Sequence, residues 1–182
     1  LSAALTFTAV APAAAADMTG TASAAAATSA EKTNPTYEVS LARRVLVAQG
    51  VLKQSQITTE LNKKVSRQEF AKMLVQLSPY KNKVGTTVKT SMYSDVKRTS
   101  AYAPYIRIAV ENGWMKGNLS GKFRPKQAVT LQESVAAVLA VLGYEDSDFQ
   151  GSLSSAKMSF YKAQKLDTNI SKKASAAMTY KE

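Results

Sequence analysis

Five short motifs in the middle of the chain decide its fold: YSDV at residues 93–96, YI at 105–106, GWMKG at 113–117, FRP at 123–125 and VTLQE at 129–133. In this order they describe a helix, a glycine-containing turn, a loop and the start of a second helix. Parts of this unit recur on both sides of it. Repeated units stack around a shared core and expose equivalent loops, which favours a binding surface over a catalyst.

The internal repeat consists of segments that match at nearly constant spacing. Residues 47–53 (VAQGVLK) match residues 110–116 (VENGWMK), an offset of 110 − 47 = 63. Residues 65–69 (VSRQE) match residues 129–133, an offset of 129 − 65 = 64. The same start returns in residues 178–182 (MTYKE), 178 − 129 = 49 positions further on. Ordered matches of this kind predict three copies of one unit.

Each copy contains a Ser/Thr-x-x-Glu helix start, in which hydroxyl and carboxylate exchange hydrogen bonds with the backbone of the first turn. These capping boxes are Ser66 to Glu69, Thr130 to Glu133 and Thr179 to Glu182. Apolar residues follow the first two boxes at helical spacing and predict one buried stripe on each helix. The stripes consist of Phe70, Met73, Leu74 and Leu77 in one copy and Val135, Val138, Leu139 and Leu142 in the next. The expected fold is all-α, built of tandem helix–loop–helix repeats.

Composition narrows the chemistry. The 182 residues include no cysteine and no histidine, which removes disulfides, the commonest zinc ligands and the commonest general base. The chain also lacks a P-loop, a dinucleotide fingerprint and a nucleophile elbow. We therefore expect no enzyme, no metal and no cofactor, although scattered carboxylates leave glycosidic chemistry open. The net charge of +11 favours an anionic partner: nucleic acid, anionic lipid or an acidic polymer.

The N-terminal stretch points to export. Residues 1–16 are apolar and end in small residues, which is typical of a secretory signal remnant cleaved before Asp17. The stretch is too short for a membrane span. The expected organisation is a signal remnant (1–16), a flexible linker (17–36), a divergent first repeat (37–80), a connector (81–92), a second repeat (93–144) and a truncated third repeat (149–182).

Residues 93–144 resemble the S-layer homology (SLH) domain family in their aromatic-x-Asp-Val opening, Gly-x-x-x-Gly turn, Phe-x-Pro loop and Val-Thr-x-x-Glu helix start. The resemblance implies three repeats whose second helices pack into a central bundle. It also implies a non-catalytic module that anchors an exported protein to a secondary polysaccharide of the bacterial cell wall, often one with pyruvylated sugars. The expected location is extracellular, at the cell wall or S-layer, where self-association into a lattice is a further option. Binding sites are expected in grooves between neighbouring repeats.

The resemblance places Arg67 at the arginine of the family's binding motif, where the other copies have Leu131 and Tyr180. A cation in the first turn of a helix opposes the macrodipole at a cost of roughly 0.3–1 kcal/mol. That placement is easier to understand if an anion docks there, because helix N-termini and guanidinium groups both bind carboxylates. The alternative is a solvated surface arginine.

Five further residues complete the candidate carbohydrate site, each with a structural alternative. Asp95 either holds a ligand hydroxyl or caps the backbone that follows it. Trp114 either stacks on a sugar or packs in the core, which its match to an aliphatic residue in the first copy favours. Lys53 and Lys116 follow equivalent turns and can add affinity for the polymer. Arg124 either contacts the polymer or is a solvated charge in the loop.

Two other functions stay open at this stage. The repeats can be the anchor of a larger exported enzyme, or the chain can be a basic nucleic-acid-binding protein. The export signal and the lack of a recognisable nucleic-acid-binding pattern argue against the second, so the expected partner is a polysaccharide rather than nucleic acid or membrane.

Overall fold

The computed structural model describes residues 35–182. The signal remnant expected at 1–16 and nearly all of the linker expected at 17–36 lie outside the described residues. Five α-helices are present in the described part, with no named strand, so the expected all-α class is confirmed. They are α1 (Pro35–Ala48), α2 (Arg67–Gln76), α3 (Ala103–Glu111), α4 (Leu131–Val141) and α5 (Leu153–Ala163). Three short 3₁₀ helices lie at Gln54–Ile57, Pro79–Lys83 and Asp146–Asp148. No helix in residues 35–182 has both the length and the apolar character to cross a membrane.

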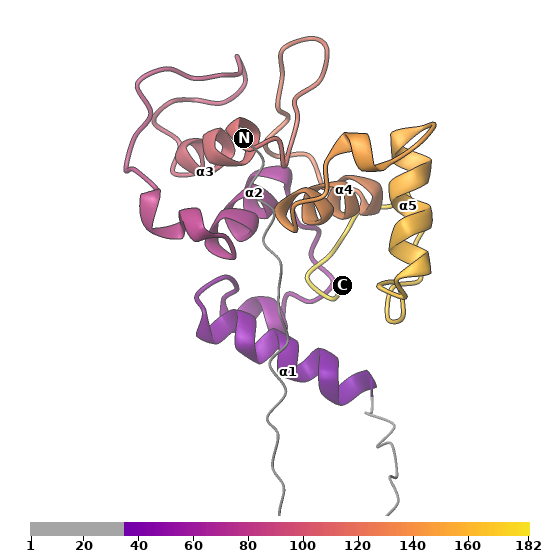
Figure 1. Cartoon of the computed structure of the whole chain (residues 1–182). Coiled ribbons are helices and arrows are strands. Elements are labelled where there is room, and N and C mark those ends of the chain that lie inside the picture. Colours follow the sequence, from indigo (N-terminus) through magenta and orange to yellow (C-terminus); the bar gives the residue numbers. More distant parts are fainter. Residues whose placement is uncertain (1–34) are drawn as a thin grey trace, which may run out of the picture. The chain divides into compact units, whose positions relative to one another are not determined.

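The helices pair across the repeat boundaries. The most extensive contacts join α2 to α3 and α4 to α5, so that the second helix of each copy lies against the first helix of the next (Figure 1). A smaller contact joins α2 to α4. The space between copies is therefore bounded by a second helix, the next first helix and the loops that join them.

A closed cycle of three backbone hydrogen bonds joins the copies. The Val65 N–H donates to the Met178 carbonyl at 3.0 Å, the Met178 N–H to the Val129 carbonyl at 2.9 Å, and the Val129 N–H to the Val65 carbonyl at 2.9 Å. All three side chains are buried. Because each copy donates once and accepts once, the three segments are related by an approximate threefold arrangement. The residue that follows each of them begins a capping box.

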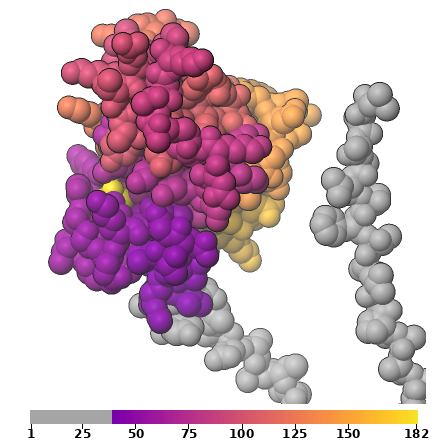
Figure 2. All heavy atoms as spheres, turned by 90° about the vertical axis from the view of Figure 1, so that its left-hand side faces the viewer, coloured from indigo at the N-terminus to yellow at the C-terminus, as the bar shows by residue number. Residues whose placement is uncertain are grey.

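Two of the three predicted capping boxes form completely, and the third forms in part, because the Thr179 hydroxyl oxygen accepts the Lys181 N–H at 3.4 Å rather than the Glu182 N–H. The backbone N–H groups of Ser66, Thr130 and Thr179 each donate to a glutamate three residues later, at 2.9 Å in every case. The first two boxes begin α2 and α4. The C-terminal segment that contains the third box, residues 178–182, contacts α1. The Arg43 Nη2 donates to the Lys181 carbonyl at 2.5 Å. Figure 2 shows this segment as a small yellow patch beside the indigo start of the described chain.

The predicted apolar stripes are correct for only part of their residues. Leu74, Val135 and Leu139 are buried, whereas Leu77, Val138 and Leu142 are exposed by 55%, 41% and 64%. The buried face of α2 instead consists of Arg67, Ala71, Leu74 and Val75. The small side chain of Ala71 is fully buried while the larger Leu77 is exposed, so contact with neighbouring helices rather than side-chain size decides which face is buried. Leu77 and Val138 line an apolar groove of about 480 Å³ that α1, α2 and α4 share with the C-terminal segment.

Candidate functional site

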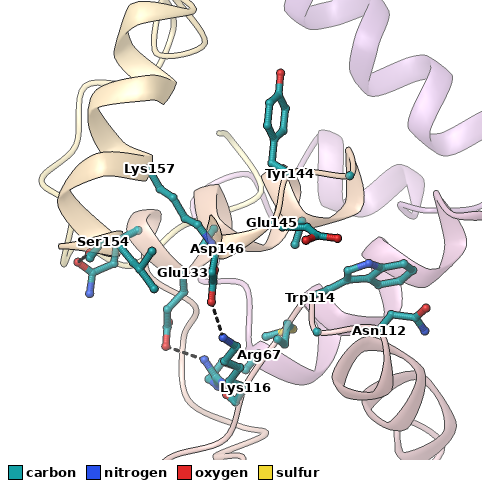
Figure 3. Close-up of a pocket in the computed structure, with 17 residues that line it drawn as sticks. Arg67, Asn112, Trp114, Lys116, Glu133, Tyr144, Glu145, Asp146, Ser154 and Lys157 are labelled. Carbon is teal, nitrogen blue, oxygen red and sulfur yellow. Dashed lines mark hydrogen bonds and ion pairs between the residues drawn. The ribbon is translucent and has the colours of Figure 1, made fainter. Parts of the chain in front are cut away.

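A groove of about 650 Å³ runs along α4 and α5. The turn after α3 forms its other side, and the first residue of α2 reaches it from a different copy. Figure 3 shows Ser154 and Lys157 of α5 on one side, Asn112 and Trp114 on the other, and Arg67 and Lys116 between them. The lining residues are Arg67, Asn112, Gly113, Trp114, Met115, Lys116, Gln132, Glu133, Ala136, Ala140, Gly143, Tyr144, Glu145, Asp146, Leu153, Ser154 and Lys157.

Arg67 is 6% exposed, so it is not a solvated surface arginine. Its Nε donates to the Phe123 carbonyl at 2.8 Å, its Nη2 to the Lys116 carbonyl at 2.7 Å and its Nη1 to Glu133 Oε1 at 2.6 Å. The guanidinium carbon also lies 4.8 Å from the centre of the Phe123 ring. A guanidinium has five N–H donors, so two remain after these three bonds. Arg67 therefore ties the loop of the second copy to α4, and two of its N–H groups have no bond partner among the described residues.

Glu133 performs two tasks, and the sequence predicted one of them. Its Oε2 accepts the Thr130 N–H at 2.9 Å, as the capping box requires, and its Oε1 pairs with Arg67. Its side chain is 36% exposed, so the ion pair is buried on one side and open on the other. The spacing within the repeat predicts the cap, whereas the ion pair depends on how two copies pack.

Sequence reasoning missed a three-residue charge bridge. Asp146 accepts from the Lys157 Nζ at 2.6 Å and from the Lys116 Nζ at 2.9 Å, which joins α5 to the turn after α3. Hydrogen bonds from Lys157 and then Lys116 lower the pKa of Asp146, although partial burial opposes them. The Lys157 side chain is 9% exposed, so this cation is part of the groove wall. No sequence signal links these residues, because they are brought together only by packing.

Most of the Trp114 surface packs inside the protein, which is the structural alternative to sugar stacking. It is 9% exposed, and its ring meets Tyr80 edge to face with centroids 5.7 Å apart. The remaining surface contributes to the groove. Tyr144 is the more accessible aromatic residue of the groove at 38% exposure, and its ring is held edge to face against Phe160 at 5.0 Å.

Asp95 serves the backbone rather than the groove. Its two carboxylate oxygens accept the N–H groups of Phe123 at 2.9 Å and Arg124 at 2.7 Å. Burial raises the pKa of Asp95, but these bonds outweigh it, and the pKa lies below the ordinary value. This clamp holds Arg124 at a positive φ of 57°. The interaction spans 28 residues, so the local spacing around Asp95 could not indicate it.

The structure thus brings together three of the six candidate residues, Arg67, Trp114 and Lys116, along one groove. Arg124 lies in a smaller adjoining cleft that also contacts Arg67 and Lys116. Lys53 is exposed at the start of the first 3₁₀ helix and does not line the groove. No group of three or more acidic residues in the described part of the chain is arranged to hold a metal ion.

The comparisons with known proteins agree with the resemblance. The S-layer homology domain family model matches residues 93–133. The chain is 31% identical over 87 residues to the middle cell wall protein of Brevibacillus brevis and 29% identical over 86 residues to the surface layer protein of Brevibacillus choshinensis. These matches cover 48% and 47% of this chain but 8% of each relative. The matched residues 93–133 contain α3, the turn at Lys116, the Asp95-clamped loop and the start of α4, and in this part the chain is similar to S-layer homology domains.

Proposed function

We propose that this chain is a non-catalytic module that attaches an exported protein to an anionic polysaccharide of the bacterial cell wall, outside the cell. The observation that carries the proposal is the groove between copies, where the buried Arg67 keeps two N–H donors beyond its three internal bonds. The match to S-layer homology domains and the names of the two relatives support the location and the partner.

Positive and negative side chains balance within the groove, so binding there depends on individual contacts rather than on the net charge of the protein. Three cations line it, Arg67, Lys116 and Lys157, and three carboxylates balance them. The net charge of +11 draws a polyanion toward the protein, but it does not select a site. Selection falls to individual donors and acceptors held at fixed positions in a concave surface.

The remaining lining suits sugar rings. Asn112, Gln132 and Ser154 provide amide and hydroxyl groups, and the Ser154 hydroxyl donates to Gln132 at 3.2 Å. Such groups both donate and accept, as sugar hydroxyls do. Sugars bound in the groove meet Gln132 and Ser154 on the wall formed by α4 and α5 and Asn112 on the opposite wall.

The three-copy organisation supports the same function. We propose that residues 37–80, 93–144 and 149–182 are equivalent units, and the hydrogen-bond cycle together with the repeated Ser/Thr–Glu bonds supports this. The two positions equivalent to Arg67 hold Leu131 and Tyr180, both buried. We propose that the groove containing Arg67 provides the main contact with the polymer. The equivalent places at Leu131 and Tyr180 have a structural role.

Blocking the groove without disturbing the core tests this function. Ser154 is exposed on the groove side of α5, whereas Ser159 is exposed on the same helix and does not line the groove. We expect Ser154→Trp to lower co-sedimentation with purified cell walls at least about tenfold, which corresponds to about 1.4 kcal/mol. Ser159→Trp should bind as the unaltered chain does. Thermal unfolding checks that both variants stay folded.

Equal binding by the two variants contradicts the assignment of the groove. Walls freed of pyruvyl ketals by mild acid provide a second arm, because weaker binding to them identifies the ketal carboxylate as the charged group. Unchanged binding to treated walls places the required charge elsewhere on the polymer.

A further inference from the structure

A second, smaller cleft of about 80 Å³ adjoins the groove at Arg67. The loop between the two helices of the second copy forms it, and it shares Arg67, Lys116 and Glu133 with the groove. Lys122 and Arg124 are the cations found in the cleft alone. Since one water takes about 30 Å³ of liquid volume, the cleft holds about two or three waters or one small ionic group.

The charge of this cleft differs sharply from that of the groove. Four cations line it, Arg67, Lys116, Lys122 and Arg124, against the single carboxylate of Glu133. The groove has three of each sign. Asp95 lies near enough to Lys122 for the lysine to help lower its pKa, and Asp146 pairs with Lys116, so counting both carboxylates still leaves the cleft with an excess of one positive charge. Two adjoining spaces therefore offer a ligand very different electrostatic environments.

Lys122 and Arg124 have little to neutralise them. Among the residues that the structure describes, neither has an acidic partner within 4.0 Å. The one side-chain bond of Arg124 is a long contact of 3.4 Å with Gln127 Oε1. Cations without partners at the mouth of a polar cleft are available to an anion at little cost, because no internal ion pair has to break.

The loop that presents these cations is held in place by its own hydrogen bonds. Asn118 Oδ1 accepts the Lys122 N–H at 2.9 Å, and the Asn118 N–H donates to the Lys122 carbonyl at 2.8 Å. The Asp95 clamp fixes the next two residues. Gly117 is required on the other side, because a side chain there would overlap the Tyr93 ring, whose hydroxyl accepts the Gly117 N–H at 3.0 Å. A preorganised loop loses little entropy on binding.

We infer that this loop cleft is a separate subsite for a compact oxyanion, a carboxylate or phosphate substituent of the polymer, while the neutral groove takes the uncharged sugar rings. The inference rests on the proposed function and divides its ligand between two spaces. Arg67 lines both spaces, so it lies where the ligand passes from uncharged sugar rings to its charged substituent. The polymer then binds through two linked contacts, which strengthens attachment beyond either alone.

The test uses paired charge variants in the full chain. Arg124→Asn removes a cation and keeps a residue that tolerates positive φ, and Lys122→Gln removes the other. Lys126→Gln is the matched control, because Lys126 is exposed in the same loop and does not line the cleft. We expect the Arg124→Asn/Lys122→Gln pair to weaken wall co-sedimentation at least about tenfold and the control less than about twofold, because a direct charge-assisted contact exceeds a screened one.

A titration with inorganic phosphate and with pyruvate, each at constant ionic strength set with chloride, provides the second readout. Either ion should shift the amide NMR signals of Gly117, Asn118, Lys122 and Arg124, and the double variant should lose these shifts. The stronger of the two probes identifies phosphate or carboxylate as the source.

Three outcomes overturn the inference. Equal losses from the cleft variants and the Lys126 control leave only a general field, and the absence of loop shifts with both probes leaves no oxyanion site. If Ser154→Trp abolishes wall binding while the cleft variants do not, the proposed function stands and the second subsite falls. If the unaltered chain binds no wall preparation, both fall together.

Discussion

The starts of α2 and α4 have the same backbone and opposite chemistry. The Arg67 N–H donates to the Gln127 carbonyl at 2.8 Å, and the Leu131 N–H donates to the Ala176 carbonyl at 3.0 Å. Both side chains are buried, at 6% and 3% exposure. Each helix therefore enters the following copy in the same way, while one presents a guanidinium and the other a hydrocarbon.

We call the place where Arg67 enters the second copy the first junction, and the place where Leu131 enters the third copy the second junction. At the second junction the cation comes from the other copy. Phe123, on which Arg67 stacks, corresponds at the 49-residue offset to Lys172, since 172 − 123 = 49. Lys172 Nζ lies 3.2 Å from Glu182, just as Arg67 lies 2.6 Å from the equivalent Glu133. An arginine–phenylalanine pair in one junction is thus replaced by a leucine–lysine pair in the other. The lesson is that at both of these junctions the capping glutamate pairs with one cation, which either neighbouring copy can supply.

The largest effect is expected when the second junction receives two cations. Leu131→Arg places a guanidinium among apolar neighbours, where it competes with Lys172 for Glu182. We expect a loss of about 3–5 kcal/mol in the free energy of unfolding, the usual cost of an uncompensated buried charge. Adding Lys172→Phe recreates the first junction and should recover about 1–3 kcal/mol, the range for coupled neighbours. Urea denaturation measures both values, and strictly additive losses would show that the junctions are not interchangeable.

A smaller loss is expected when the first junction loses its only cation. Arg67→Leu copies the second junction without its lysine, so Glu133 and the Phe123 and Lys116 carbonyls lose their donor. Since Glu133 is partly exposed, we expect about 2–4 kcal/mol, somewhat below the full cost of breaking a buried pair. The matched control is Arg107→Leu, which removes an exposed arginine paired with Glu111 and should cost under about 0.5 kcal/mol. Similar losses from the two variants in urea denaturation would mean that the Arg67 network does not stabilise the fold.

The contrast also shows what the sequence could predict. The capping boxes and the repeat offsets were predictable, because a cap involves residues three positions apart and depends on local backbone only. The all-α class followed from them. The 3₁₀ helix Gln54–Ile57 could not be predicted, since a single turn leaves almost no periodic signal.

The site was less predictable because its contacts join distant residues. The Arg67–Glu133 pair spans 66 residues and the Lys116–Asp146 pair spans 30. The first separation exceeds the 64-residue repeat offset by two and the second matches no helical or repeat period, so no local pattern indicates either contact. Arg67 was found because the resemblance places it at a motif arginine and because its helix position is unfavourable for a cation, whereas Lys157 and Asp146 occupy unremarkable positions in the sequence. The unfavourable position of a charge can be read from the sequence, whereas the groups that compensate it are found only in the folded structure.

The smallest expected effect concerns how the second junction holds its glutamate. Burial raises the pKa of Glu182, but the Thr179 hydroxyl and N–H, followed by Lys172, more than offset it, so the pKa lies below the ordinary value. A carboxylate with a depressed pKa in the folded state stabilises the protein above its unfolded pKa, about 4.3 for glutamate, and this contribution disappears as the pH falls through the folded value. Lys172→Met should raise the pKa of Glu182 in an NMR titration and cost about 1 kcal/mol or less at neutral pH. Lys173→Met, which removes the neighbouring charge without breaking the ion pair, should leave the pKa nearly unchanged. Equal pKa changes in the two variants would show that Lys172 acts through the general field of this basic chain, and its equivalence to Arg67 would then be lost.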